Sequence, residues 1–342
     1  MKTVLISIIS EQTIPNVLMI RELRGQYDEL AFITTSQMEE KCVGDHVEMA
    51  CGLDKGSVGR IVVEPDLLQR TSELLSENFS NENHYLVNIT GGTKLMSVAV
   101  FEFFSKMSSE IFYVPIGKNR YRRVFPYDQV EERDIRCRLS LKAYLLAYGR
   151  YFSGENKLKR DASVSMQLLK DLNKVGFDQS RVFQIFHAQE LPDREDRTYF
   201  SGGWFEEYCF HVIQQHFKGS DVWMNVEVLR DKDQVKNDNE YDVMFVYENA
   251  LYAMECKARI WKHKPTGSPL KRHLDDCLYK LAGVTKNVGL RVNSYLLVLS
   301  DLDQFSVESK ENLKMRTNLL GIKGVIAQSD FNGKSDWVKK IK

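Results

Sequence analysis

The sequence predicts an α/β protein with two domains, a Rossmann-like domain followed by a domain with a mixed sheet. Two observations carry this prediction. Residues 3–115 alternate short apolar runs with longer amphipathic stretches, and from Gly202 onward the order changes to α-β-β-β-α-β. The chain has 342 residues, of which 43% are apolar, which is enough for two hydrophobic cores.

Five apolar runs predict the strands of the first domain. They are Val4–Ile9, Leu30–Thr34, Ile61–Val63, Tyr85–Ile89 and Ile111–Val114. Between them, helices are expected at Asn16–Leu23, Asp66–Leu75 and Lys94–Phe104. Because strands that alternate with helices form βαβ units, we expect a parallel sheet whose ligands bind beyond the carboxyl ends of its strands.

The stretch Thr90-Gly91-Gly92-Thr93-Lys94 stands between the fourth strand and the third helix. Glycine lets the backbone approach an anion, and the first N–H groups of a helix point toward it. We therefore expect a phosphate site here, next to the loop Ser10 to Asn16 after the first strand. A plain tight turn has the same pattern. A dinucleotide site is disfavoured because no G-x-G-x-x-G follows the first strand.

Residues 116–200 have a weaker pattern. Gly117 to Arg123 predicts a basic loop, residues 138–152 a helix, and Gly154 to Ala162 a linker. Two further helices are expected at Val164–Leu172 and Gln179–Glu190. The predicted domains are therefore residues 1–137 and 201–342, joined by a helical connector and linker, 138–200.

The second domain begins with a predicted helix and a strand and then a hairpin. Its predicted elements are the helix Trp204–Phe217, the strands Val222–Leu229, Tyr241–Val246 and Leu251–Cys256, the helix Leu270–Leu281, the strand Ser294–Leu299, the helix Val307–Leu319 and the strand Gly324–Ala327. A hairpin loop of residues 247–250 places Val246 opposite Leu251. Counting back along both strands, Asp242 then faces Glu255, and Glu240 faces Lys257.

Two carboxylates on opposed strand positions have Cβ atoms about 4.5–5.5 Å apart, and they repel each other unless a cation lies between them. Hard oxygen ligands suit Mg²⁺ or Mn²⁺, so Asp242 and Glu255 are the predicted metal ligands. Lys257 shares the face of Glu255 because it stands two residues further on. Glu206 lies on the apolar stripe of its helix and is the preferred third acid, whereas Glu207 lies on the predicted solvent stripe.

This pattern resembles the PD-(D/E)xK nuclease superfamily, with Asp242 as the D and Glu255-Cys256-Lys257 as E-x-K. Tyr241 stands where many members have proline. The resemblance implies a restriction-endonuclease-like fold and metal-assisted phosphodiester hydrolysis, with Glu206, Asp242, Glu255 and Lys257 as catalytic residues. A basic segment with Trp261 follows Lys257, and it fits either nucleic-acid binding or a solvated loop.

With that domain, the first domain resembles the CARF (CRISPR-associated Rossmann fold) domains, and the whole chain resembles the CARF nucleases of type III CRISPR systems. This resemblance implies a homodimer that binds a cyclic oligoadenylate, usually cyclic tetra-adenylate, on its two-fold axis and then cleaves DNA or RNA. The implied ligand-binding residues are Ser10, Gln12, Thr13, Asn88, Thr90, Gly91, Gly92, Thr93 and Lys94, with Lys118, Arg120 and Arg122 as further candidates.

Composition limits the other functions. No apolar run approaches the roughly 18 residues that cross a membrane, and no signal peptide is expected at the start of the chain. Six scattered cysteines fit buried thiols in the cytoplasm. The net charge is zero, so nucleic acid would bind at a local patch. The alternatives are a constitutive nuclease of repair or restriction type with an N-terminal dimerisation domain, a regulator with an inactive nuclease-like domain, and a nuclease whose N-terminal domain also degrades its activator.

Overall fold

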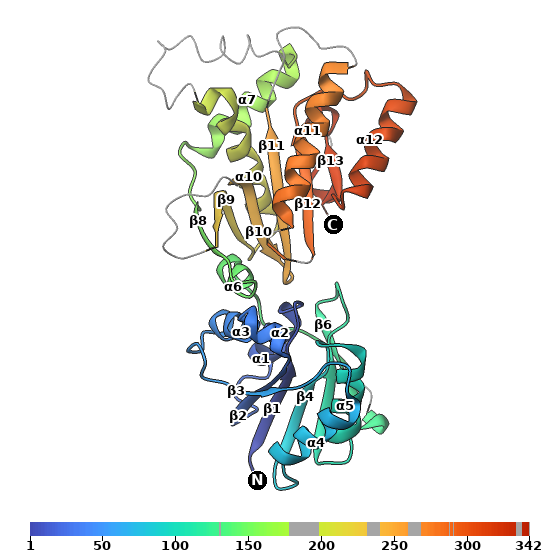
Figure 1. The fold of residues 1–342 in the computed structure, drawn as a ribbon. Helices are drawn as coiled ribbons and strands as arrows, with labels where there is room; N and C mark the ends of the chain where they lie inside the picture. Colours follow the sequence, from blue (N-terminus) through green and yellow to red (C-terminus); the bar gives the residue numbers. More distant parts are fainter. Residues whose placement is uncertain are drawn as a thin grey trace. The chain divides into compact units, whose positions relative to one another are not determined.

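The structure is a computed structural model that describes residues 1–129, 131–177, 198–230, 240–258, 268–286, 288–289, 291–332 and 337–341. It divides into two compact units, Met1–Tyr151 and Phe152–Lys342 (Figure 1). The division falls inside the predicted connector, residues 138–200. Within the described part of the chain, that connector is shared between the two units and forms no unit of its own.

The first unit contains a seven-stranded sheet with the order β3-β2-β1-β4-β5-β6-β7. Its strands are β1 (Thr3–Ile8), β2 (Glu29–Thr34), β3 (Gly59–Val62), β4 (His84–Asn88), β5 (Ser109–Tyr113), β6 (Arg120–Phe125) and β7 (Glu131–Asp134). The first five are parallel, as predicted, and β6 and β7 extend the sheet in the antiparallel sense. The Rossmann-like prediction is confirmed.

The helices of the first unit are α1 (Ile14–Glu22), α2 (Ser36–Glu40), α3 (Val43–Cys51), α4 (Leu68–Asn78), α5 (Lys94–Phe104) and α6 (Leu141–Leu146). A short 3-10 turn, Tyr127–Gln129, follows β6. Apolar side chains of β1, β4, α4 and α5 form a core that includes Ile6, Val87, Leu75 and Phe104. The sequence prediction missed α2 and α3, because residues 36–51 place many polar side chains among short apolar runs.

The basic loop predicted at Gly117 to Arg123 is wrong for its second half, which is β6. Arg120 Nε lies 3.0 Å from Asp134 Oδ1, and Arg122 Nε lies 3.2 Å from Glu132 Oε1. Opposite charges that face each other across an antiparallel pair stabilise the pairing. Arg120 and Arg122 thus have acidic partners on β7, which weakens their assignment as ligand-pocket residues.

The second unit contains a six-stranded sheet with the order β13-β12-β11-β10-β9-β8. Its strands are β8 (Tyr151–Glu155), β9 (Asp221–Leu229), β10 (Glu240–Tyr247), β11 (Ala250–Lys257), β12 (Val292–Val298) and β13 (Gly324–Ile326). The strand β10 runs antiparallel to β9 and β11, whereas β11, β12 and β13 are parallel. The predicted mixed sheet is confirmed.

The start of the second unit differs from the prediction. Residues 138–152 were expected to be one helix, but α6 ends at Leu146 and β8 begins at Tyr151. Gly154, which suggested a linker, lies in β8. A Cβ atom there would be 3.2 Å from the Met224 carbonyl oxygen, so the glycine allows β8 to approach β9 closely.

Helices cover both faces of this sheet (Figure 1). They are α7 (Ala162–Val175), α10 (Trp204–His216), α11 (Ser268–Thr285) and α12 (Val307–Leu319), with a π-turn at Tyr199–Gly203 and 3-10 turns at Gln328–Phe331 and Trp337–Lys340. α10 packs against side chains such as Phe245 and Met254, whereas α11 packs on the opposite face against Leu296. The helix predicted at Gln179–Glu190 lies outside the described residues. No helix in the described ranges has the length and apolar character of a membrane span.

Candidate functional site

The hairpin of β10 and β11 has the predicted register. Val246 pairs with Leu251 and Val243 with Met254, so Asp242 and Glu255 stand at the next position along both strands. The loop is shorter than predicted, because Tyr247 and Ala250 also pair. Glu248 and Asn249 form the turn with φ of 48° and 62°, the left-handed conformation that tight hairpins require.

Lys257 lies between the two carboxylates. Its Nζ atom is 2.7 Å from Glu255 Oε1 and 3.1 Å from Asp242 Oδ2, and it donates a third hydrogen bond of 3.2 Å to the Cys256 carbonyl oxygen. Both carboxylates are buried, and the Cys256 N–H donates a further hydrogen bond of 2.6 Å to Asp242 Oδ2. Asp242, Glu255 and Lys257, which we call the acid–lysine cluster, are thus brought together as predicted.

Lys280 is a fourth residue here that the sequence reasoning missed. It lies on α11, and its Nζ atom is 3.0 Å from Glu255 Oε1. Glu255 pairs with Leu296 of β12, a side chain that packs under α11, so Glu255 faces that helix. The signal in the sequence was weak: Lys280 adjoins the buried stripe of Leu274, Leu278 and Leu281, where lysines often border a solvated face.

Glu206 of α10 is close enough to the acid–lysine cluster to interact electrostatically with Asp242, Lys257 and Glu255. Burial raises the pKa of Glu206 to about 8, and the charge of Asp242 acts in the same direction. Burial, followed by the charge of Glu255, raises the pKa of Asp242 to about 6 despite the opposing effect of Lys257. Burial alone would lower the pKa of Lys257, but the two carboxylates raise it.

The prediction that Glu207 faces solvent is wrong. Its side chain is buried and accepts a hydrogen bond of 2.5 Å from the Lys159 N–H. The segment between β8 and α7 packs over that side of α10, which a helical pattern taken alone does not reveal. Glu207 therefore connects α10 to the segment before α7. Glu206 is the acid of this helix whose pKa the charges of the acid–lysine cluster change.

The residues of this site fit a divalent metal. Mg²⁺ and Mn²⁺ take oxygen ligands, and Mg²⁺ commonly uses one or two carboxylates with waters and substrate phosphate as its other ligands. Asp242 and Glu255 supply two carboxylates, and a cation bound to them would oppose the burial and mutual repulsion that raise the pKa of Asp242 and of the half-buried Glu206. In the described part of the chain, no group of three His, Cys, Asp or Glu side chains forms a metal site by itself.

The raised carboxyl pKa values make a prediction for stability. Between the ordinary carboxyl pKa and about pH 8, the folded protein binds more protons than the unfolded chain, so the metal-free protein loses stability as the pH rises. We expect its melting temperature to fall from pH 6 to pH 8 in EDTA. In Glu206→Gln protein that fall should be smaller, whereas Glu311→Gln on the exposed face of α12 should match the wild type. Equal pH dependence in all three proteins would contradict the raised pKa of Glu206.

The Gly91-Gly92 turn lies at the carboxyl edge of the first sheet, as predicted. Ser7 of β1 pairs with Asn88 of β4, so the loops after these strands are neighbours. A Cβ atom on Gly91 would lie 2.1 Å from the Ile8 carbonyl oxygen and 3.1 Å from Ser10 Oγ. Gly92 has a φ of +78°. Both positions thus require glycine, and the turn rests directly on the loop after β1.

Two of the residues predicted to contact phosphate, Asn88 and Thr90, make hydrogen bonds within the protein. Asn88 is fully buried, donates to Ser7 Oγ over 3.1 Å and accepts from both the N–H and the hydroxyl of Thr90. The Thr90 hydroxyl also accepts a hydrogen bond of 2.9 Å from the Val114 N–H. Asn88 was predicted to contact ligand, but its polar groups brace the turn, so its direct contact with a phosphate is not supported.

The other residues predicted to contact the ligand differ in how far they are exposed to solvent. Thr93 caps α5, accepting from Met96 N and donating to the Pro65 carbonyl oxygen. Thr13 is buried, and its hydroxyl has no hydrogen-bond partner in the described residues. Ser10 and Gln12 are half-buried, and Lys94 is exposed at the first turn of α5. Lys94 therefore stands at the N-terminus of α5, where the first N–H groups of a helix lack partners within the helix itself.

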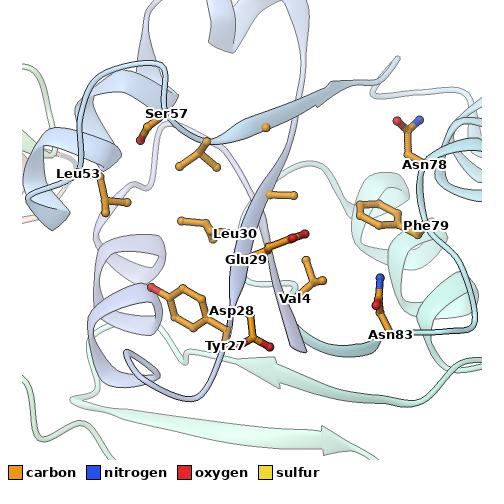
Figure 2. Close-up of a pocket in the computed structure, with 13 residues that line it drawn as sticks. Val4, Tyr27, Asp28, Glu29, Leu30, Leu53, Ser57, Asn78, Phe79 and Asn83 are labelled. Atoms are coloured by element: carbon orange, nitrogen blue, oxygen red, sulfur yellow. The ribbon is translucent and has the colours of Figure 1, made fainter. Parts of the chain in front are cut away.

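A cavity of about 580 Å³ lies elsewhere in the first unit, lined by residues of β1, β2 and β3 near their amino ends (Figure 2). Asp28 and Glu29 are among its lining residues. Asp28 accepts a hydrogen bond from the Thr3 N–H, and Glu29 pairs with Lys2. Its carboxylates disfavour an anionic ligand, so this cavity is distinct in place and chemistry from the Gly91-Gly92 turn.

Two family models match the chain, one in each part of the sequence. Residues 4–144 match the family model of the Card1 CARF domain, and residues 193–323 match the model of the Card1-like endonuclease domain. Among curated proteins, none matches the chain.

The solved structures that share the fold include three with the following similarities. Can2 from Sulfobacillus thermosulfidooxidans, solved in complex with cyclic tetra-adenylate, has a TM-score of 0.71 and 20% identity over 99% of each chain. Protein VC1899 from Vibrio cholerae has a TM-score of 0.73 and 16% identity over 97% of this chain and 95% of its own. A type III CRISPR defence DNA nuclease activated by cyclic oligoadenylate has a TM-score of 0.56 and 18% identity over 86% of this chain and 45% of its own. With both domain models matched in order along most of its length, the chain belongs to the family of CARF-domain nucleases, with a Card1 CARF domain followed by a Card1-like endonuclease domain.

Proposed function

We propose that this protein is a metal-dependent nuclease that a cyclic oligoadenylate activates and that cleaves DNA or RNA in type III CRISPR antiviral defence. The observation that carries the proposal is the acid–lysine cluster, two buried carboxylates bridged by Lys257 in an endonuclease domain. The presence of a CARF domain in the same chain supports control of the nuclease by a second messenger. Cyclic tetra-adenylate is the favoured activator because Can2, which shares the fold, was solved with it.

Asp242 and Glu255 would hold Mg²⁺ or Mn²⁺. When bound, such an ion lowers the pKa of water and offsets the negative charge of the phosphate. Lys257 is held by three acceptors, so its ammonium would be preorganised to stabilise negative charge that develops on the phosphate. Glu206 would be the third acid of the site, because burial and the charge of Asp242 raise its pKa beside the two carboxylates.

Activation would occur in a homodimer. A symmetric ring of adenylates suits a pocket on a two-fold axis, because each subunit presents the same surface to it. Ser10, Gln12 and Lys94 are the side chains best placed to contact the ring, together with the backbone of Gly91 and Gly92. Asn88 and Thr90 would act by holding that backbone in place.

A chain of contacts connects the loop after β1 to the end of the first unit, and it would transmit a movement caused by ligand binding. The helix α1 begins directly after the loop of Ser10, Gln12 and Thr13 and ends at Glu22. The buried Glu22 carboxylate accepts hydrogen bonds of 2.9 Å from the N–H groups of Arg136 and Cys137, which lie shortly before α6. Movement of the loop would therefore reach the segment that leads into the second unit.

We expect Glu22→Ala protein to bind cyclic tetra-adenylate but to respond to it less, because two backbone donors lose their acceptor. Allosteric coupling is commonly about 1–3 kcal/mol, so activation should fall by roughly 5-fold or more. Binding is measured by calorimetry and activation as the ratio of cleavage rates with and without ligand. Glu29→Ala, which removes a surface ion pair with Lys2, is the control. Full activation of the Glu22→Ala protein would exclude this route.

The function itself is tested by cleavage of labelled single- and double-stranded DNA and RNA with Mg²⁺ or Mn²⁺, with and without cyclic oligoadenylates of several ring sizes. We expect cleavage to require metal and to rise with one ring size. Lys94→Met protein should need a higher ligand concentration and keep its basal rate, because it lacks an exposed cation beside the Gly91-Gly92 turn. Equal cleavage with and without every ring would favour the constitutive nuclease, and no cleavage under any condition would favour an inactive domain.

A further inference from the structure

Glu255 binds two lysines that differ in their surroundings. Lys257 and Lys280 both reach Glu255 Oε1, at 2.7 Å and 3.0 Å. Lys257 comes from the same strand, β11, and its side chain is 29% exposed, whereas Lys280 comes from α11 and its side chain is 50% exposed. Glu255 Oε1 thus contacts both a lysine inside the site and a lysine that solvent can reach.

The two lysines also differ in how many of their hydrogen-bond donors are used. An ammonium group has three donors. Those of Lys257 have three acceptors, on Asp242, Glu255 and the Cys256 backbone. In the described ranges, the acceptor of Lys280 is Glu255 alone. Lys280 therefore keeps donors for a further partner, and Lys257 does not.

The charges of the site indicate what that partner is. Asp242 and Glu255 together carry two negative charges when ionised, and Lys257 and Lys280 carry two positive charges. Glu206 of α10 adds a third negative charge when it is ionised. Without a metal the set therefore has no positive excess, and a divalent cation bound to the carboxylates would give it one. A phosphate diester offsets such an excess with its single negative charge, and an exposed lysine binds it as a point charge.

We infer that Lys280 is a further residue of the nuclease site, one that binds the phosphate backbone of the nucleic-acid substrate beside the acid–lysine cluster. Without substrate, Glu255 holds the Lys280 ammonium in place. This inference rests on the proposed nuclease function of the same site. It concerns substrate binding and gives Lys280 no part in bond cleavage.

The test measures binding of fluorescein-labelled 20-nucleotide single-stranded DNA, the corresponding duplex and the corresponding RNA to the full chain. Cyclic tetra-adenylate is present, and Ca²⁺ replaces Mg²⁺ to limit cleavage. We expect Lys280→Met protein to bind about tenfold more weakly, as the loss of one charged hydrogen bond predicts. Lys280→Arg should restore binding. Lys314→Met on the exposed face of α12 is the matched control.

Salt dependence separates a phosphate contact from a structural role. Loss of one phosphate contact should reduce the slope of log K against log salt by about 0.9 for duplex and about 0.7 for single strands. The difference among the three probes identifies the strand type that Lys280 contacts. Wild-type affinity in Lys280→Met protein would overturn the inference. Weaker binding with an unchanged slope and no rescue by arginine would also overturn it, because Lys280 would then only position Glu255.

A second assay distinguishes failure of the proposed nuclease function from failure of the inference about Lys280. Asp242→Asn protein is assayed for cleavage beside the Lys280 variants. If it cleaves at the wild-type rate, the acid–lysine cluster is not the active site, and the proposed function fails at this site. If it is inactive while Lys280→Met binds and cleaves as wild type, only the inference about Lys280 fails.

Discussion

Asp242→Asn protein is expected to bind cyclic tetra-adenylate with wild-type affinity and to lose nuclease activity by roughly 10²- to 10³-fold or more, the size of effect seen when one preorganised charge-stabilising group is removed. Asparagine keeps the shape of the side chain but removes one of the two carboxylates that would hold the metal. It also leaves Lys257 and Lys280 with only Glu255 to balance their charge. Cleavage of labelled substrate and calorimetry with the ligand measure the two effects separately.

The control for this variant is Asp303→Asn. Asp303 is an exposed acid of the same unit that pairs with Lys310 at the surface, so its loss should leave cleavage unchanged. Thermal melting shows whether the Asp242→Asn protein is folded. We expect its melting temperature in EDTA to fall less than that of the wild type as the pH rises from 6 to 8, because a group whose pKa is raised in the folded protein has been removed. Normal cleavage by a folded Asp242→Asn protein would show that the active site lies elsewhere.

Gly91→Ala protein is expected to show the opposite separation, with activation lost and the nuclease unit intact. The new Cβ atom would lie 2.1 Å from the Ile8 carbonyl oxygen, a backbone atom that cannot turn aside. Overpacking of this kind costs about 1–3 kcal/mol, and the Gly91-Gly92 turn must move away from the loop of Ser10 to relieve it. If ligand binding depends on that turn, its affinity should fall by about 10- to 100-fold.

Gly59→Ala is the matched control for Gly91→Ala, since a Cβ atom on Gly59, in β3 of the same sheet, meets no atom within 4 Å. Calorimetry with cyclic tetra-adenylate measures the binding, and cleavage without ligand measures the basal rate. The basal rate should be equal in both variants. Wild-type affinity in the Gly91→Ala protein would place the ligand away from the turn. Loss of basal cleavage as well would mean that the substitution disturbs more than the first unit.

Together, these two variants test the division of labour between the domains. The first should retain binding without cleavage, and the second should retain basal cleavage without activation. A nuclease that does not need its N-terminal domain for control would be insensitive to Gly91→Ala. The pair thus distinguishes the activated nuclease from the constitutive alternative in one set of proteins.

The amino-acid sequence by itself was enough to predict β1 to β5 of the first sheet and β9 to β13 of the second, the register of the β10–β11 hairpin and the strand–turn–helix order around Gly91 and Gly92, whereas β6, β7 and β8 were not predicted. These features depend on local rules. Side chains alternate along a strand, and the register places Asp242 beside Glu255 once one pair is known. Glycine pairs mark turns that other residues cannot form without strain.

Only the tertiary structure decided which side chains share a contact across distant parts of the chain. Lys280 reaches Glu255 because α11 packs over β12, and Glu207 is buried because the segment after β8 covers its helix. Asn88 faces inward because Ser7 of a neighbouring strand accepts its hydrogen bond. Periodicity assigns a side chain to a face of its own element. The element that covers that face is chosen by the packing of the whole unit, and this packing gives Lys280 a carboxylate partner and Asn88 a structural role.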